Sequence, residues 1–254
     1  MRLTSLVLLA FATAGAQPPE AREQVNLGVT AYKNAQYPLA AAYFTEAIRL
    51  DPEYVTARLY LGTTYMGQYI PGADSPENVR LAELAEQQFL AVLDRDAAND
   101  IAIASLASLY YNQKKFDDSK RWHEKLTLLN PESKESWYTL GVIAWSKWYP
   151  LYSAARARTG MKPEDPGPIA DEKVRQDLKM RFGSAIDEGI RNLERALKLD
   201  PEYDDAMAYM NLLVRGRADL LDSRSEYRRE IEIADDWVQK TLATKKKKAE
   251  TRAR

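Results

Sequence analysis

Cysteine and histidine are almost missing from this chain. Its 254 residues include no cysteine and a single histidine, His123. Disulfides, thiolate catalysis, iron–sulfur clusters and cysteine-based zinc sites are therefore excluded, as are metal sites rich in histidine. The formal net charge of −1 gives no general electrostatic attraction for nucleic acid. We predict no cofactor, no metal and no nucleic-acid partner.

Glycine and proline are also few, at 11 and 12 residues, and they gather between patterned segments. The sequence has no phosphate loop, no dinucleotide fingerprint and no Gly-x-Ser-x-Gly elbow. Beyond residue 16 no apolar run reaches the ~20 residues needed to span a membrane. Ala, Leu, Glu, Lys and Arg dominate what remains, and these residues favour helices.

The first sixteen residues have the pattern of a secretory signal. Arg2 supplies a positive start, residues 3–14 are apolar, and Ala14-Gly15-Ala16 is a small-residue cleavage site before Gln17. An uncleaved anchor or a buried helix is the alternative interpretation. We predict that residues 1–16 are removed and that the chain is secreted across the cytoplasmic membrane, into a bacterial periplasm.

Residues 100–133 predict one complete helix–turn–helix unit. The apolar face of the first helix recurs at i, i+3, i+4 and i+7: Ile103, Leu106, Ala107 and Tyr110. Polar residues 112–115 interrupt the pattern before a second helix. That helix carries its own face at similar spacing: Phe116, Ser119, His123 and Leu126. Pro131 ends the unit because its ring disfavours helical geometry at the residue before it.

The same unit recurs along the chain. Equivalent pairs of residues stand in four first helices: Leu27-Gly28, Leu61-Gly62, Leu106-Ala107 and Leu140-Gly141. The segments around Pro52 and Pro201 are near duplicates. In period and pattern the chain resembles the tetratricopeptide repeat (TPR) family. The resemblance implies an all-α fold, a TPR-type α-solenoid in which antiparallel helix pairs form a right-handed superhelix.

The pattern divides residues 21–243 into about five repeats. Their predicted bounds are 21–54, 55–99 with an insertion, 100–133, 134–203 with a larger insertion at 146–182, and an irregular 204–243. Within the larger insertion an aromatic helix continues past the usual turn, a Gly/Pro-rich loop follows, and a charged helix leads into the next element. The basic residues 244–254 predict a disordered tail.

In TPR proteins the first helix of each repeat lines the inner groove, so the resemblance implies which residues face a partner here. The register predicts eleven: Val25, Val29, Tyr32, Leu59, Thr63, Met66, Ser108, Tyr111, Tyr138, Val142 and Trp145. Most are apolar or aromatic, which favours a protein or peptide segment as partner. The alternative is that the large insertion or the C-terminal helix fills the groove.

Other chemistry-bearing residues have simpler interpretations. His123 stands at the repeat position of Phe44 and Phe89, which favours packing over a general base. Four carboxylates near the large insertion fit a solvated face better than a cation site, because lysines and arginines interleave with them: Asp165, Asp171, Glu172 and Asp177. The basic tail is a soluble end or a weak contact for anionic surfaces.

We therefore predict a non-catalytic, exported scaffold that binds a partner segment through an apolar and aromatic groove. Two alternatives stay open at this point. One is a structural or assembly factor of the cell envelope that self-associates through exposed aromatic residues. The other is an enzyme that uses the carboxylates of the insertion.

The signal generates the first prediction. The native protein, isolated from the cells that make it, should begin at Gln17, because the small residues before it fit the signal peptidase. N-terminal sequencing measures this directly. An intact residue 1 in a membrane fraction would restore the anchor interpretation.

Overall fold

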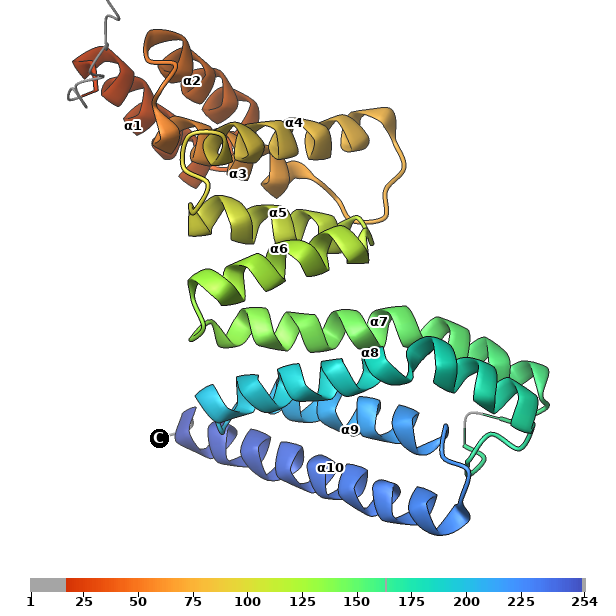
Figure 1. Cartoon of the computed structure of the whole chain (residues 1–254). Coiled ribbons are helices and arrows are strands. Elements are labelled where there is room, and N and C mark those ends of the chain that lie inside the picture. Colours follow the sequence, from red (N-terminus) through yellow and green to blue (C-terminus); the bar gives the residue numbers. More distant parts are fainter. Residues whose placement is uncertain (1–16, 163, 253–254) are drawn as a thin grey trace, which may run out of the picture. The chain divides into compact units, whose positions relative to one another are not determined.

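The computed structural model describes residues 17–162 and 164–252, and the predicted signal lies outside them (Figure 1). Within these ranges the chain is helical and has no strand, so the all-α prediction is confirmed. The helices divide into two compact units, the first ending at Arg95 and the second beginning at Asp96. The border lies beside Ala97, which replaces the proline found at the other repeat boundaries.

The first unit contains four helices. They are α1 (Pro19–Lys33), α2 (Tyr37–Leu50), α3 (Val55–Gln68) and α4 (Pro76–Leu93). Helix α1 packs against α2, α3 packs against α4, and α2 joins the two pairs by packing against α3. Each helix therefore contacts the next one along the chain, as expected for a repeat array.

The second unit contains six helices. They are α5 (Asp100–Asn112), α6 (Phe116–Leu129), α7 (Lys134–Arg158), α8 (Glu172–Leu199), α9 (Asp204–Ala218) and α10 (Arg224–Arg252). The pairs are α5 with α6, α7 with α8, and α9 with α10. Helices α7 and α9, both first helices of their pairs, also contact each other. The predicted unit 100–133 is thus a helix pair.

A small residue allows close approach within three of these pairs. A Cβ added to Gly28 would lie 2.5 Å from the Phe44 ring, and one added to Gly62 would lie 2.7 Å from Phe89. In the α7–α8 pair a Cβ on Gly141 would lie 2.4 Å from Leu193. Since all three large partners are completely buried, the small–large contact sets the distance between the paired helices.

The insertion in the second repeat is a short loop held by one asparagine. Ser75 caps α4, because its side chain accepts a hydrogen bond from the Asn78 N–H. The Asn78 side chain is buried and bonds the Ile70 N–H and C=O and the Ala73 C=O, each at 2.8 Å. These bonds satisfy loop backbone groups that regular structure leaves open.

The larger insertion lengthens both helices of the fourth pair. Helix α7 continues through Pro150 to Arg158, and α8 begins at Glu172, well before the usual start of a second helix. The connecting loop docks on the turn between α9 and α10. There Ile169 donates its N–H to the Asp219 carbonyl, and the Gly167 N–H donates to the Tyr227 hydroxyl.

The prediction of a disordered tail is wrong for residues 244–252. Helix α10 continues to Arg252, and Lys247 and Lys248 form ion pairs with Glu202 and Asp204. The reason is the antiparallel pairing of α10 with α9. It brings lysines in the last turns of one helix beside carboxylates at the start of the other, and both sets of charges suit the helix dipoles.

The small–large contacts predict that two glycine-to-alanine substitutions change the free energy of unfolding in opposite directions. Gly28→Ala should lower the free energy of unfolding by about 1–3 kcal/mol, because the added methyl group overlaps the buried Phe44 ring. The control, Gly67→Ala in α3, should raise it by about 0.5–1 kcal/mol, because alanine favours helix. Its Cβ would meet only the Tyr32 hydroxyl, at 3.6 Å. Urea denaturation followed by circular dichroism measures both; stabilisation by both variants would contradict the close approach.

Candidate functional site

The predicted groove residues of the first unit lie on α1 and α3. Five of them are half-buried and are called here the N-terminal face: Val29, Tyr32, Leu59, Thr63 and Met66. Val25 is only 6% exposed, because α2 and α3 contribute side chains to the core cluster in which it packs. Its prediction as a partner-binding residue is corrected on that ground.

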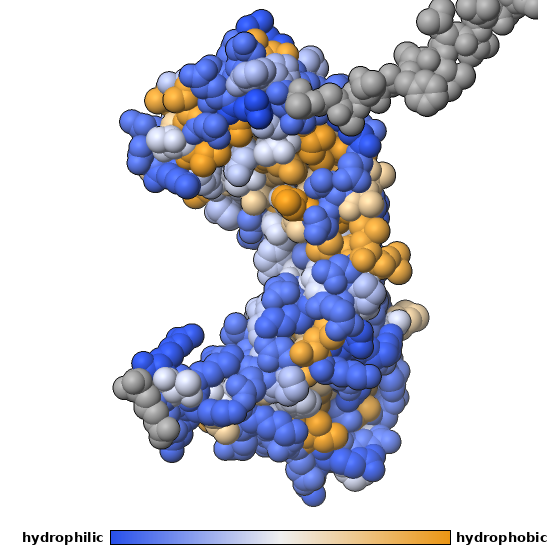
Figure 2. Space-filling view, turned by 90° about the vertical axis from the view of Figure 1, so that its left-hand side faces the viewer, coloured by the Kyte–Doolittle hydropathy of each residue, from blue (hydrophilic) through white to orange (hydrophobic). Residues whose placement is uncertain are grey.

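Exposure alone does not distinguish the N-terminal face. Elsewhere the first unit exposes Leu39, Ile70 and Val79 more fully. Figure 2 shows hydrophobic patches on this unit separated by hydrophilic side chains. Scattered apolar residues of this kind are common on protein surfaces. The five residues of the face therefore stay a prediction.

The predicted groove residues of the second unit lie on α5 and α7. Four have accessible surface and are called here the C-terminal face: Ser108, Tyr111, Tyr138 and Trp145. Val142 is 5% exposed and therefore serves packing, so its prediction as a partner-binding residue is also corrected. It lies between Tyr138 and Trp145 on the same helix face, and the large rings on either side remain half-buried.

Aromatic contacts join α7 to α9 at this face. The Tyr138 ring lies 4.9 Å from Tyr203 and 5.7 Å from Tyr209, measured between ring centroids. Trp145 meets Tyr209 edge-on at 5.5 Å and stacks on Tyr149 at 4.8 Å. Such pairs are stabilising beyond the area they bury. The rings are thus fixed in place while part of each stays accessible.

The three tyrosines that meet where α7 packs on α9, Tyr138, Tyr203 and Tyr209, have neutral hydroxyl groups. Burial raises the pKa of Tyr138 and of Tyr209, and the nearby Tyr111 hydroxyl adds to the shift of both. Burial likewise raises the pKa of Tyr203 to about 12. The hydroxyls of Tyr138, Tyr203 and Tyr209 can therefore donate to a carbonyl or carboxylate at neutral pH.

A buried ion pair lies beyond the C-terminal face, where α7 extends. The Arg156 guanidinium donates from Nη1 to Asp219 at 2.7 Å, and the Tyr152 hydroxyl donates to the same carboxylate. Burial raises the pKa of Asp219, although the arginine and the hydroxyl oppose that shift. Arg156 Nη2 also donates to the carbonyls of Lys162 and Asp165. This cluster ties the insertion loop to the end of α9.

The repeat register could have found further residues on α9. Leu140 follows Pro131 by nine residues (140 − 131), and Met210 follows Pro201 by nine (210 − 201). The positions equivalent to Val142 and Trp145 are therefore Leu212 and Arg215, which the sequence prediction left out. No comparable signal exists for Tyr203 and Tyr209, because their part in the cluster depends on how α7 and α9 pack.

His123 is 7% exposed, and burial lowers its pKa to about 4. The ring is therefore neutral at physiological pH, and its buried Nδ1 makes no hydrogen bond within the described chain. The packing interpretation of this histidine agrees with that burial. A smaller ring suits this repeat, because Ala107 stands where the first two repeats have glycine.

The carboxylates of the insertion have local structural partners. Asp165 accepts the Lys162 N–H, Asp171 caps α8 by accepting the Val174 N–H, and Asp177 pairs with Arg181. Among the described residues no group of three or more acidic, histidine or cysteine side chains could hold a metal ion. Within the same ranges no helix is long and apolar enough to cross a membrane.

Paired antiparallel helices stacked on one another define the class of this protein, an α-helical repeat protein. The family comparison is more specific. Residues 25–68 match the model of the tetratricopeptide repeat, so the chain contains this repeat. No curated protein matches the sequence.

Solved structures extend the likeness to most of the chain. A crystal structure of MamA is 15% identical, with 91% of this chain and 94% of that one covered and a TM-score of 0.62. MamA residues 41-end from Desulfovibrio magneticus RS-1 are 13% identical, with 91% of this chain and 98% of that one covered and a TM-score of 0.61. YrrB, a TPR protein with an unusual peptide-binding site, is 14% identical, with 89% of this chain and 92% of that one covered and a TM-score of 0.55. The fold is thus that of a TPR α-solenoid.

The buried histidine generates a pH-dependent prediction. Its pKa falls from about 6.5 unfolded to about 4 folded, so the unfolded chain binds the proton first as the pH drops. The contribution of the neutral, buried His123 to the free energy of unfolding is fully present above pH 6.5. It is lost as the pH falls from 6.5 to 4, and the loss amounts to at most about 3 kcal/mol. His123→Leu, which adopts the residue of the fourth repeat, should lack this part of the pH dependence. Urea denaturation at pH 7.5, 5.5 and 4 compares the two proteins, and parallel curves would contradict a neutral buried ring.

Proposed function

We propose that this chain is an exported, periplasmic scaffold without catalytic activity, which binds a segment of a partner protein at the C-terminal face. The TPR fold supports a protein-interaction role in general. The choice of face depends on one observation, the half-buried rings of Tyr111, Tyr138 and Trp145.

The polar groups at the ends of these rings are available to a partner. Within the described chain the Tyr111 and Tyr138 hydroxyls and the Trp145 indole N–H have no hydrogen-bond partner, and none of the three is buried beyond reach. A rigid aromatic body with a free polar tip suits an interface, where the body buries area and the tip finds a backbone group. A partner segment with apolar side chains and an exposed backbone fits these groups.

The course of the insertion supports an open face. Its loop bonds to Asp219 at the end of α9 and to Tyr227 in the first turn of α10, and α10 packs along α9. These are the two elements that would otherwise fill the groove. Self-association through the same rings remains the rival function, and light scattering on the purified chain distinguishes it from a monomeric scaffold.

Truncation of one ring tests the proposal. A partner is first obtained by crosslinking in the native envelope, and its segment is then titrated against purified variants. Trp145→Ala should weaken binding about 30-fold, as a hot spot of ~2 kcal/mol does. It should lower folding stability by only about 1 kcal/mol, the range of the two aromatic pairs it removes.

The control is Trp122→Ala on α6, where a half-buried indole lies beneath the Lys125 ammonium outside the C-terminal face. It should leave binding unchanged. If Trp145→Ala instead destabilises the fold by about 3–5 kcal/mol, the indole is a core residue and the proposal fails. Equal loss of binding in the two variants would also count against this face.

A further inference from the structure

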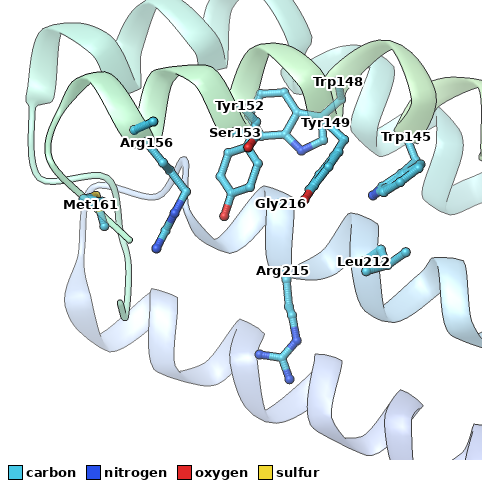
Figure 3. A pocket seen from close by; sticks show the side chains of 11 residues that line it. Trp145, Trp148, Tyr149, Tyr152, Ser153, Arg156, Met161, Leu212, Arg215 and Gly216 are labelled. Carbon is cyan, nitrogen blue, oxygen red and sulfur yellow. The ribbon is translucent and has the colours of Figure 1, made fainter. Parts of the chain in front are cut away.

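A pocket of about 300 Å³ lies between the extension of α7 and the last turns of α9 (Figure 3). Its size is at the lower end of the range for small-ligand sites, ~300–1,000 Å³. One residue or one ring compound would fill it. Only Trp145 is shared with the C-terminal face, and the binding of such a ligand would go beyond the proposed capture of a partner segment.

The walls of the pocket are aromatic. Trp145 stacks on Tyr149 at 4.8 Å, and Trp148 stacks on Tyr152 at 4.9 Å. Figure 3 shows these side chains descending from α7 toward α9, where Leu212 and Gly216 face them. Flat rings in stacked pairs offer large rigid surfaces for another ring or a compact apolar group.

The pocket is not a by-product of repeat packing. Three of its four aromatic residues lie beyond Trp145, in the part of α7 that the other repeats lack: Trp148, Tyr149 and Tyr152. Gly216 makes room for one of them, because a Cβ there would lie 2.5 Å from Trp148 Nε1. Sequence features particular to the fourth and fifth repeats therefore build this cavity.

Two arginines line the pocket, and none of the described side chains that line it is acidic. Their carboxylate partners, Asp219 for Arg156 and Asp235 for Arg215, stand outside the lining. Arg156 is 5% exposed, and its buried Nε has no hydrogen-bond partner. The Nε itself is too buried to reach a ligand, so Arg156 contributes to the pocket through the part of its side chain that lines it.

From these groups we infer that the pocket binds a compact aromatic or apolar group that carries a carboxylate. The ring lies against the Trp145–Tyr149 wall, and the carboxylate accepts hydrogen bonds from the arginines, which suit it better than an uncharged oxygen. A cation, which an aromatic enclosure alone would favour, is opposed by the two guanidinium groups. The ligand is either a free acid or the last residue of a polypeptide, since both present this chemistry.

Three probes with one ring and different charge test the inference. Indole-3-propionate, its neutral amide and tryptamine are titrated calorimetrically into the purified chain, with no partner protein present. The acid should bind at least about tenfold tighter than the amide, and tryptamine should bind weakest. Failure of all three up to about 10 mM, or equal affinity of acid and amide, overturns the inference. Neither result bears on segment binding at the C-terminal face.

Matched variants locate the interaction. Arg215→Gln should abolish the preference for the acid, whereas Arg217→Gln should retain it. Arg217 is on the same helix but pairs with Glu230 and Asp187 outside the pocket. Tyr149→Ala, at a residue 45% exposed, should weaken acid and amide alike. Loss of preference in the Arg217 variant, or unchanged affinity in the Tyr149 variant, would contradict the site.

The source of the ligand is read from a fourth and a fifth probe. A short peptide ending in tryptophan is compared with the same peptide bearing a C-terminal amide. Tight binding of the free-ended peptide identifies a chain terminus, and binding of the small acid alone identifies a free compound. Both results support the ligand chemistry, and tighter binding of the amidated peptide overturns it.

Discussion

Contact between a small residue on one helix and a large buried residue on its partner sets the spacing of the helix pairs from which this protein is built. Gly28 against Phe44 and Gly141 against Leu193 bring paired helices close enough to exclude water between them. Within each unit, one pair then packs against the next through α2 and α3, α6 and α7, and α8 and α9. In the second unit this packing brings the first helices α7 and α9 into contact, so that residues of the fourth and fifth repeats meet.

The fourth repeat keeps the close contact between its paired helices, but the turn that joins the two helices lies further along the chain. The Gly141 contact is retained, while α7 and α8 both continue beyond it and need a new surface to bury Trp148. They find it on α9, where Gly216 admits the indole. The buried Arg156–Asp219 pair then fixes the connecting loop. Buried ion pairs contribute more to a defined geometry than to net stability, and here that geometry forms one end of a ligand-sized pocket.

Function in this chain is therefore expected where the repeat is irregular or where its inner residues stay accessible. Small side chains at regular repeat positions, such as Val25 and Val142, are buried by neighbouring helices. Large rings at the same register, such as Trp145, are too wide to be covered by one neighbouring helix and retain a free edge. The same width gives both the face proposed to bind a partner and the aromatic wall of the pocket. Activity thus depends on sites placed on a common fold rather than on the fold itself.

The repeat, the all-α fold and the extension of the fourth helix pair could be predicted from the residues alone, because these follow from local spacing and helix-ending residues. Long-range packing, in contrast, is what makes Arg156 and Asp219, 63 residues apart (219 − 156), a buried pair. It also decided that the last lysines continue a helix, since their partners come from the start of α9. Periodicity reports which face of a helix is apolar, whereas long-range packing decides which side chains cover it.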